Sequence, residues 1–99
     1  MINRKKISEL GQHIGEEVGI AGWVDVRRDH GKLIFIDLRD ASGKVQMVIL
    51  PNHEEAHLKA QELRPEWVIK VKGNINARPE KMINKDQQNG DLEVEVLEI

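Results

Sequence analysis

One strand-like segment of this sequence combines an aromatic side chain with charged side chains. Residues 33–39, LIFIDLR, alternate between aliphatic and other side chains, which is typical of a strand with one face toward a core. The aliphatic residues can face this core, and Phe35 then shares the opposite face with Asp37 and Arg39. An exposed aromatic beside arginine is what stacking on a nucleic-acid base requires. We therefore expect a base-binding platform at Phe35, with ordinary packing against a neighbouring loop as the alternative.

A second segment has the spacing of a metal site. His53–His57, HEEAH, matches the HExxH pattern of zinc proteases, in which two histidines bind zinc and the glutamate acts as a base. However, this segment directly follows Pro51 at the start of a short predicted helix, and a catalytic zinc needs a third protein ligand. A solvated helix start is the simpler interpretation, so we predict no metal site and no cofactor.

Length and composition predict a single domain, residues 1–99, that is soluble and globular. A chain of 99 residues, 39% hydrophobic and 32% charged, can bury one modest core but is too small for most complete enzymes. It has no cysteine, no GxxxxGK phosphate loop and no convincing nucleophile–base pair. We therefore expect no catalysis by this chain alone. Without a membrane-spanning run or a signal-peptide pattern, we expect a cytoplasmic protein.

The distribution of charge is more informative than its sum. The formal net charge of −2 argues against a strongly basic protein that coats nucleic acid, but it allows a local basic face. Basic residues cluster within 27–44 and 70–85, whereas acidic residues concentrate at 16–17, 54–55 and 93–98. This asymmetry predicts one basic surface, with the acidic residues elsewhere.

Alternation of apolar residues predicts five strands and one helix after a lead-in of residues 1–15. The strands are expected at about 17–28, 32–39, 44–50, 67–77 and 91–97, and the helix at about 52–63. Three strands, a helix and two strands form the order of an all-β OB-fold, a five-stranded Greek-key barrel with one helix between strands three and four. Another small antiparallel α+β fold is the main alternative.

The same pattern predicts where several individual residues lie. On the first strand, Val24 and Val26 share one face and Arg27 lies on the other. Bends are expected at Gly22 and Gly73, and a turn at residues 40–43. Asn52 is the expected N-cap of the helix. Ile7, Leu10 and Ile14 are expected to close one end of the core, and Trp23 and Trp67 to lie in the core or at its edge.

The residues themselves resemble a known family. Residues 22–49, GWVDVRRDHGKLIFIDLRDASGKVQMVI, closely resemble the N-terminal anticodon-binding domain of bacterial-type aspartyl-tRNA synthetases, which are class II aminoacyl-tRNA synthetases. The similarity extends over the whole chain, and RRDHG and FIDLRD are far more specific than a generic OB-fold pattern. Lysyl and asparaginyl relatives share the fold but match this sequence less well. The family continues into a catalytic domain beyond the position of Ile99, so the resemblance implies a non-catalytic module that is a monomer by itself.

The resemblance also implies a role for individual residues in binding an aspartate-type tRNA. Phe35 would stack on the central anticodon base, a uridine, and Gln46 would hydrogen-bond the edge of that base. Arg28 would contact the cytosine side, and Glu93 would accept hydrogen bonds from the first base, a guanine. Further contacts to the backbone or to base edges are implied for Arg64, Arg78 and Asn84, and weaker ones for Arg27, Val48, Asn76 and Met82.

Three positions depart from the pattern of the family. Arginine is frequent where this chain has Val26 and Asn76, and asparagine where it has Met82. We therefore expect weaker affinity or a shifted anticodon preference. Two other functions stay open: a general single-strand binder, which a single exposed aromatic disfavours, and a free-standing paralogue that regulates or binds proteins. Arg27 and Arg28 have their own alternative, simple solvation of a hairpin.

Overall fold

The described residues form five strands, one α-helix and one 3-10 helix. The structure is a computed structural model that describes residues 4–79, 83 and 88–99. In chain order, the elements are η1 (Ile7–Gln12), β1 (Glu17–His30), β2 (Leu33–Asp40), β3 (Gly43–Ile49), α1 (Glu54–Ala60), β4 (Val68–Ala77) and β5 (Leu92–Glu98). None of the helices in these ranges is long and apolar enough to cross a membrane.

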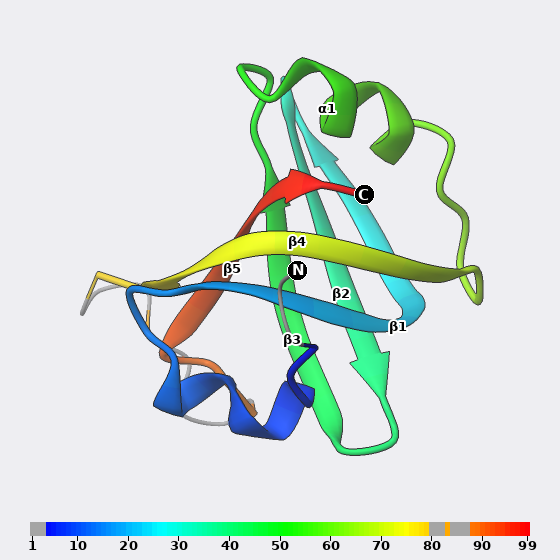
Figure 1. The fold of residues 1–99 in the computed structure, drawn as a ribbon. Helices are drawn as coiled ribbons and strands as arrows, with labels where there is room; N and C mark the ends of the chain where they lie inside the picture. The colour runs from blue at the N-terminus through cyan, green and yellow to red at the C-terminus, as the bar shows by residue number, and fades with distance from the viewer. Residues whose placement is uncertain (1–3, 80–82, 84–87) are drawn as a thin grey trace.

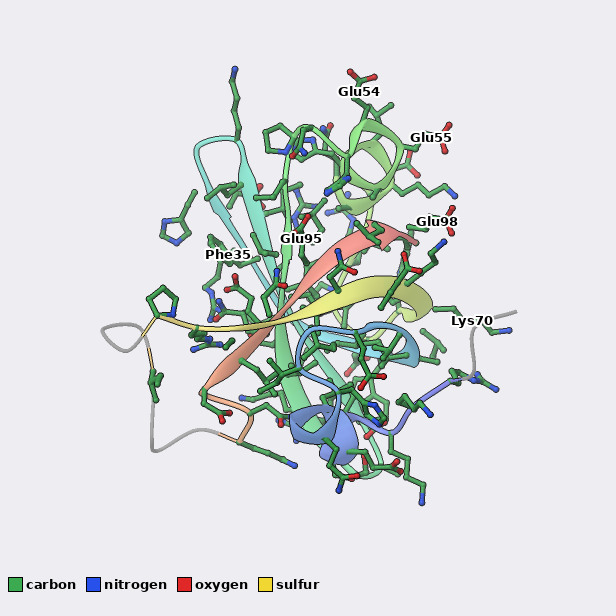
Figure 2. The ribbon with its side chains drawn as sticks, turned by 60° about the vertical axis from the view of Figure 1, so that its left-hand side comes forward. Phe35, Glu54, Glu55, Lys70, Glu95 and Glu98 are labelled. Atoms are coloured by element: carbon green, nitrogen blue, oxygen red, sulfur yellow. The ribbon has the colours of Figure 1, made fainter. Side chains whose placement is uncertain are left out.

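The strands close into a barrel in the order β1-β2-β3-β5-β4. The long strand β1 pairs with β4 through its first half and with β2 through its second half, and both pairings are antiparallel. Among the five strands, β3 and β5 pair in parallel, while α1 covers one end of the barrel (Figure 1). This topology confirms the predicted OB-fold. Figure 2 shows Phe35 of β2 and Lys70 of β4 on opposite sides of the barrel.

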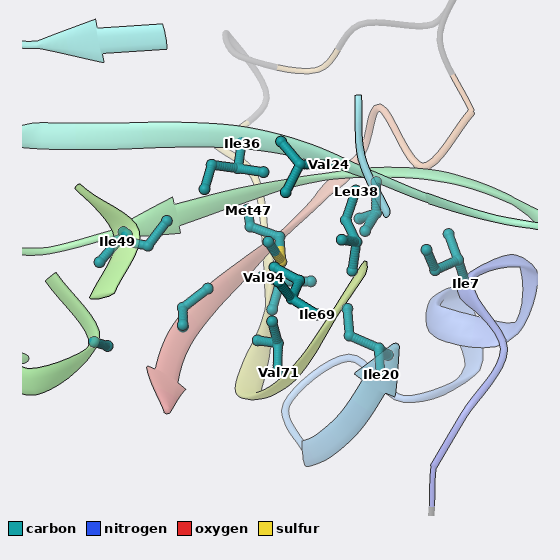
Figure 3. Packing of buried hydrophobic residues seen from close by; sticks show 14 of the residues in the cluster. Ile7, Ile20, Val24, Ile36, Leu38, Met47, Ile49, Ile69, Val71 and Val94 are labelled. Carbon is teal, nitrogen blue, oxygen red and sulfur yellow. The ribbon is translucent and has the colours of Figure 1, made fainter. Parts of the chain in front are cut away.

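The barrel interior holds the predicted aliphatic faces of all five strands. Ile36, Leu38, Met47 and Val94 are fully buried at its centre (Figure 3). Ile7 of η1 and two alanines of α1 join the same core from the two ends of the barrel. This burial supplies most of the stabilisation of the fold, at about 25 cal/mol per Å² of apolar surface. The outward faces of the strands are therefore free to carry polar side chains.

A β-bulge in β1 changes the predicted faces of that strand. Val24 pairs with Leu38 and Val26 with Asp37, so Asp25 is an extra residue without a partner of its own. An extra residue reverses the alternation that follows it. Val26 is consequently 40% exposed and does not share the buried face of Val24, as the uninterrupted pattern had predicted. The irregularity lies three residues beyond Gly22, the predicted bend.

Two glycines allow strands to approach closely. A Cβ atom at Gly22 would lie 2.3 Å from the carbonyl oxygen of Arg39, so this position on β1 excludes larger residues without a backbone shift. At Gly73, a Cβ atom would lie 2.6 Å from the carbonyl oxygen of Glu95, and the register with β5 shifts here. The predicted irregularity at Gly73 is thus confirmed.

The turn between β2 and β3 is fastened by one carboxylate. Asp40 accepts hydrogen bonds from the backbone N–H groups of Ile7, Ser42 and Gly43 and from the Ser42 hydroxyl. Burial acts to raise the pKa of Asp40, but these hydrogen bonds outweigh it and hold the pKa below its ordinary 3.8. The predicted turn at residues 40–43 therefore also anchors η1.

Other sequence expectations at the ends of elements were wrong. The helix is shorter than predicted, and its N-cap is His53 rather than Asn52, without a side-chain capping bond. Trp67 is exposed because β4 begins only at Val68, and Trp23 is exposed because it points outward opposite Val68. Ile14 is exposed because it lies after η1, beyond the core.

Candidate nucleic-acid interface

Strand pairing gathers the predicted binding residues on one outer face of the barrel. Phe35 of β2 lies opposite Arg28 of β1 and Val48 of β3. Gln46 lies opposite Asp37. Directly opposed residues point to the same side of a sheet. These side chains border a groove of about 930 Å³ lined by Arg28, His30, Leu33, Phe35, Gln46, Val48, Leu50, Asn76, Arg78, Glu93 and Glu95.

Phe35 is held at the edge of this groove without being buried. Its ring makes an edge-to-face contact with His30, with ring centroids 5.7 Å apart and an interplanar angle of 81°. Val48, which is buried, lies beside it on β3. The aromatic ring is thus both supported and partly exposed, which is the arrangement that base stacking needs.

A chain of hydrogen bonds crosses the groove beside Phe35. Arg28 donates from Nη2 to Asp37 Oδ1 and to Gln46 Oε1, both at 3.2 Å. Gln46 in turn donates from Nε2 to Glu93 Oε2 at 2.9 Å. Four strands therefore contribute side chains that can donate or accept hydrogen bonds. We call Asp37, Arg28, Gln46 and Glu93 the groove network.

The groove is not purely basic, so the expected separation of charges was wrong. Glu93 and Glu95 line it together with Arg28 and Arg78, and buried Asp37 lies beneath Arg28. The reason is the period of two on β5, which brings alternate glutamates to the outer face next to β3 and β4. Alternation had already placed Asp37 on the face of Phe35, although no binding role was assigned to it. The same alternation, applied two residues beyond Glu93, was the signal that could have identified Glu95.

The two histidines of the HEEAH segment point to different partners. His53 Nε2 lies 2.8 Å from Glu95 Oε2, and Asn76 Nδ2 donates to the other oxygen of the same carboxylate at 3.2 Å. His57 Nε2 lies 2.7 Å from the carbonyl oxygen of Lys32. In the described part of the chain, no three histidine, cysteine or acidic side chains converge as a metal site would require. The segment fastens α1 to the barrel.

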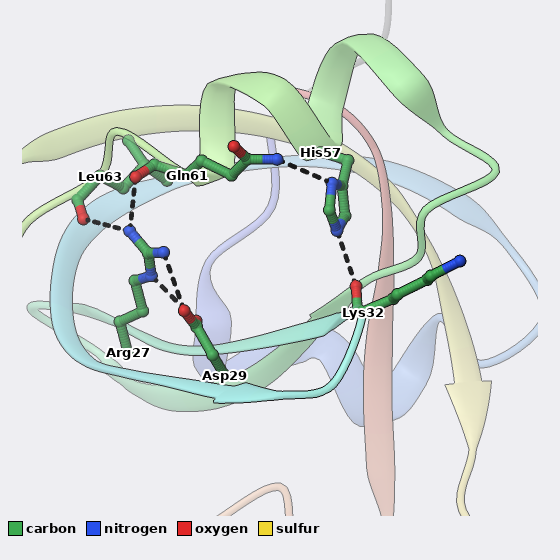
Figure 4. Close-up of polar contacts among 6 residues, drawn as sticks. All are labelled: Arg27, Asp29, Lys32, His57, Gln61 and Leu63. Carbon is green, nitrogen blue, oxygen red and sulfur yellow. Dashed lines mark hydrogen bonds and ion pairs between the residues drawn. The ribbon is translucent and has the colours of Figure 1, made fainter.

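Arg27 lies outside the groove, against the C-terminal end of α1 (Figure 4). It donates to the carbonyl oxygens of Gln61 and Leu63 at 2.7 and 3.3 Å and forms two hydrogen bonds with Asp29. These hydrogen bonds from Arg27 hold the pKa of the Asp29 carboxyl below its ordinary 3.8. We call this cluster, together with the contact of His57 to Lys32, the helix clamp.

The remaining predicted binding residues divide among three places. Arg78 lines the groove, and its backbone N–H donates to the carbonyl oxygen of Asp91 at 2.9 Å. Exposed Arg64 instead borders a second hollow of about 500 Å³ beside Arg27 and Asp29. Asn84 and Met82 lie outside the described residues. The structure therefore brings together Arg28, Phe35, Gln46, Val48, Asn76, Arg78 and Glu93, but not Arg27 or Arg64.

Comparison with curated proteins finds relatives that are much longer than this chain. The chain is 55% identical over 84 residues to the aspartate–tRNA(Asp/Asn) ligase of Halothermothrix orenii, which covers 84% of this chain and 14% of that protein. It is 49% identical over 94 residues to the protein of the same name from Syntrophomonas wolfei, and this match covers 93% of this chain and 16% of that protein. The match thus spans only about one seventh of these relatives.

Solved structures and a family profile agree with this match. The asparaginyl-tRNA synthetase from Pyrococcus horikoshii, complexed with asparaginyl-adenylate, is 33% identical in sequence and has a TM-score of 0.79. The match covers 99% of this chain and 22% of the synthetase chain. An aspartyl-tRNA synthetase from Entamoeba histolytica shares the fold, with a TM-score of 0.84 and 20% sequence identity. This match covers 98% of this chain and 20% of that chain. The profile of the OB-fold nucleic acid binding domain family tRNA_anti-codon matches residues 18–99. The resemblance inferred from the sequence is thereby confirmed, and the chain belongs to this family of OB-fold nucleic acid binding domains.

Proposed function

We propose that the groove binds the anticodon loop of an aspartate-type tRNA and that the chain is the recognition module of an aspartate–tRNA ligase. The observation that carries the proposal is the position of Phe35 beside the groove network. Anticodon loops present unstacked bases, which proteins read by aromatic stacking and by hydrogen bonds to base edges. A supported aromatic ring next to a series of donors and acceptors supplies both. The relatives are aspartate–tRNA(Asp/Asn) ligases, which supports the same substrate class.

The groove network matches the chemistry of the three proposed bases. Phe35 stacks on the central uridine. Gln46 keeps one N–H and one oxygen lone pair beyond its bonds to Arg28 and Glu93, and these can pair with the edge of that uridine. Glu93 is an acceptor suited to the N–H groups of guanine at the first position. Arg28 is a donor suited to the cytosine side.

Contacts with the tRNA backbone come from cations around the groove. Arg78 lies within the groove, whereas Arg64 lies in the second hollow, so the bound strand would have to extend past the end of α1 to reach both. Asn84 remains part of the proposal. Exposed Val26 offers no donor, and Asn76 donates to Glu95, so we expect affinity below that of a chain with arginine at these positions.

The chain itself supplies recognition and not aminoacylation. It corresponds to 14–16% of its curated relatives, and the remaining length of a whole ligase would hold the ATP-dependent chemistry. We further propose that it acts in the cytoplasm, where tRNA is used in translation, and that the isolated domain is a monomer.

Titration of the chain with anticodon stem-loops at one fixed salt concentration tests the proposal, because salt alone shifts such affinities. A loop with GUC should bind about tenfold or more tightly than a loop with GAC, since an unpaired polar edge costs about 1–3 kcal/mol. Equal binding of any single strand would favour the general single-strand binder, and no binding would favour a protein-interaction module. A GUU loop tests whether this chain accepts both tRNAs named for its relatives.

A further inference from the structure

Asp37 is a buried, charged residue beneath the groove, paired with Arg28, for which the proposed base contacts give no role. It is 3% exposed, and it is the one charged residue that is buried within the described ranges. It lies on β2 between Val26 of β1 and Gln46 of β3, two residues from Phe35. A carboxylate in such a position is costly unless it is paired. Its partner is therefore central to what it does.

The partner of Asp37 is the guanidinium of Arg28. Arg28 Nη2 lies 3.2 Å from Asp37 Oδ1, while the Arg28 side chain remains 43% exposed toward the groove. The buried carboxylate of Asp37 thus restricts the conformation of the Arg28 side chain. This restriction matters because an arginine side chain has many rotamers and loses entropy when it is held in one of them. Without the carboxylate, the Arg28 side chain would keep only its hydrogen bond to Gln46 within the described part of the chain.

Arg28 in turn determines the orientation of the Gln46 amide. The same Nη2 atom donates to Gln46 Oε1, and Gln46 Nε2 donates to the Glu93 carboxylate. A flipped amide would place its NH₂ group against the guanidinium and its oxygen against the carboxylate, and both contacts would be repulsive. The amide therefore presents one fixed order of donor and acceptor to the groove.

We infer that Asp37 is a positioning residue that fixes the Gln46 amide through Arg28 and thereby selects uracil over cytosine at the central base. The inference rests on the proposed function. Uracil offers an N3–H donor next to a carbonyl acceptor, whereas cytosine offers an N3 acceptor next to an amino donor. An amide with a fixed orientation can satisfy only one of these two orders, but an amide that is free to flip can satisfy both. The loss of Asp37 should therefore relax selectivity more than it weakens binding.

The test is the ratio of dissociation constants for GUC and GCC stem-loops, measured for the wild-type chain and for Asp37→Asn. The variant keeps the size of the side chain and removes its charge. We expect the preference for GUC to fall by about tenfold, through tighter binding of GCC relative to GUC. A merely structural role would weaken both loops equally and leave the ratio unchanged.

A matched control lies on the same two strands. Arg39 of β2 and Asp25 of β1 also form a cross-strand pair at 3.2 Å, outside the groove. Asp25→Asn should leave the ratio at its wild-type value. If it lowers the ratio as much as Asp37→Asn does, the effect belongs to the hairpin in general and the inference is wrong.

Folding of the variants is checked by thermal unfolding. If Asp37→Asn does not fold, the double variant Asp37→Leu with Arg28→Met removes both charges together, a replacement that is often neutral for stability. It should show the same loss of preference. If Asp37→Asn or the double variant folds and retains the wild-type ratio, the inference about Asp37 is wrong, but the proposed function is unaffected. A wild-type chain that does not distinguish GUC from GAC overturns the proposed function, and the inference with it.

Discussion

Arg27 and Arg28 are consecutive residues of β1, yet they belong to two polar clusters of different kinds. Arg27 joins the helix clamp, where it bonds to an exposed carboxylate and to two backbone carbonyls. Arg28 joins the groove network, where it bonds to a buried carboxylate and to a side-chain amide. The side chain of Arg27 is 23% exposed and that of Arg28 is 43% exposed.

The difference between the clusters lies in their acceptors. In the helix clamp, Arg27 donates to the backbone carbonyls of Gln61, the cap residue of α1, and of Leu63, which lies beyond it. Carbonyls at and after a helix end lack helical partners, and a side chain that donates to them contributes to folding. Acceptors of this kind cannot turn toward a ligand. The groove network instead links side chains that retain unused donors and acceptors facing a hollow. We therefore propose that the helix clamp serves stability and that the groove network serves recognition, and the following variants test this division.

The largest expected effect concerns binding through Phe35. Phe35→Ala should weaken binding of a GUC stem-loop by about 1–3 kcal/mol, because stacking on one base is worth this amount. The free energy of unfolding should change less, because the ring is only partly buried. Isothermal titration and chemical unfolding measure the two quantities.

Trp67→Ala is the matched control for Phe35→Ala. Trp67 is a larger aromatic residue that is 50% exposed and does not line the groove. Its replacement should leave loop affinity unchanged. Unchanged affinity in Phe35→Ala, or an equal loss in both variants, would contradict the stacking role.

The second effect concerns folding through Arg27. Arg27→Ala should lower the free energy of unfolding by about 1–2 kcal/mol, because the carbonyl oxygens of Gln61 and Leu63, which follow α1, lose their donor. Loop affinity should remain within about twofold, since Arg27 lies outside the groove and its guanidinium is already bound to Asp29 and to two backbone carbonyls. Lys70→Ala, on the far side of the barrel from Phe35 (Figure 2), should change neither quantity. A loss of affinity without a loss of stability in Arg27→Ala would place Arg27 in the interface.

The barrel could be predicted from the sequence because its core obeys simple alternation. Ile34, Ile36 and Leu38 are buried as the period of two requires, and the glycines and prolines mark most ends of strands. The ends of α1 were less predictable. Apolar spacing extends to Leu63, but the helix ends at Ala60, and tertiary contacts such as those of Arg27 hold the residues that follow.

The division between Arg27 and Arg28 could not be derived from alternation. An uninterrupted strand would have placed Arg27, and not Arg28, on the face of Phe35. The bulge at Asp25 exchanges the two faces, and no residue type in this segment requires a bulge. Only the resemblance to the family indicated that Arg28 was the stronger candidate. The burial of Asp37 also depends on neighbouring strands, and a single strand pattern does not contain that information.

The third effect concerns the other half of the helix clamp. His57→Ala removes the contact of the imidazole with the Lys32 carbonyl at the tip of the β1–β2 hairpin. The free energy of unfolding should fall by about 0.5–1.5 kcal/mol, as is usual for one hydrogen bond. Affinity for the GUC loop should stay close to wild type, because the groove network is not altered. If binding falls more than stability does, the hairpin tip belongs functionally to the groove, and the division between the two clusters fails.

The smallest effect is a dependence of stability on pH through Asp29. Hydrogen bonds from Arg27 make the pKa of Asp29 lower in the folded chain than the 3.8 expected when unfolded. The pair therefore stabilises the fold at pH values above 3.8, and this contribution is lost as the pH falls through the folded pKa. Asp29→Asn should be slightly less stable than wild type at pH 6, and the two should converge in acid. Urea unfolding at a series of pH values measures this. A difference that persists unchanged below the folded pKa would show that the Asp29 contribution is not electrostatic. The affinity of Asp29→Asn for the GUC loop near neutral pH is the second measurement. It should equal that of the wild type, because a carboxylate of the helix clamp should influence stability and not loop binding.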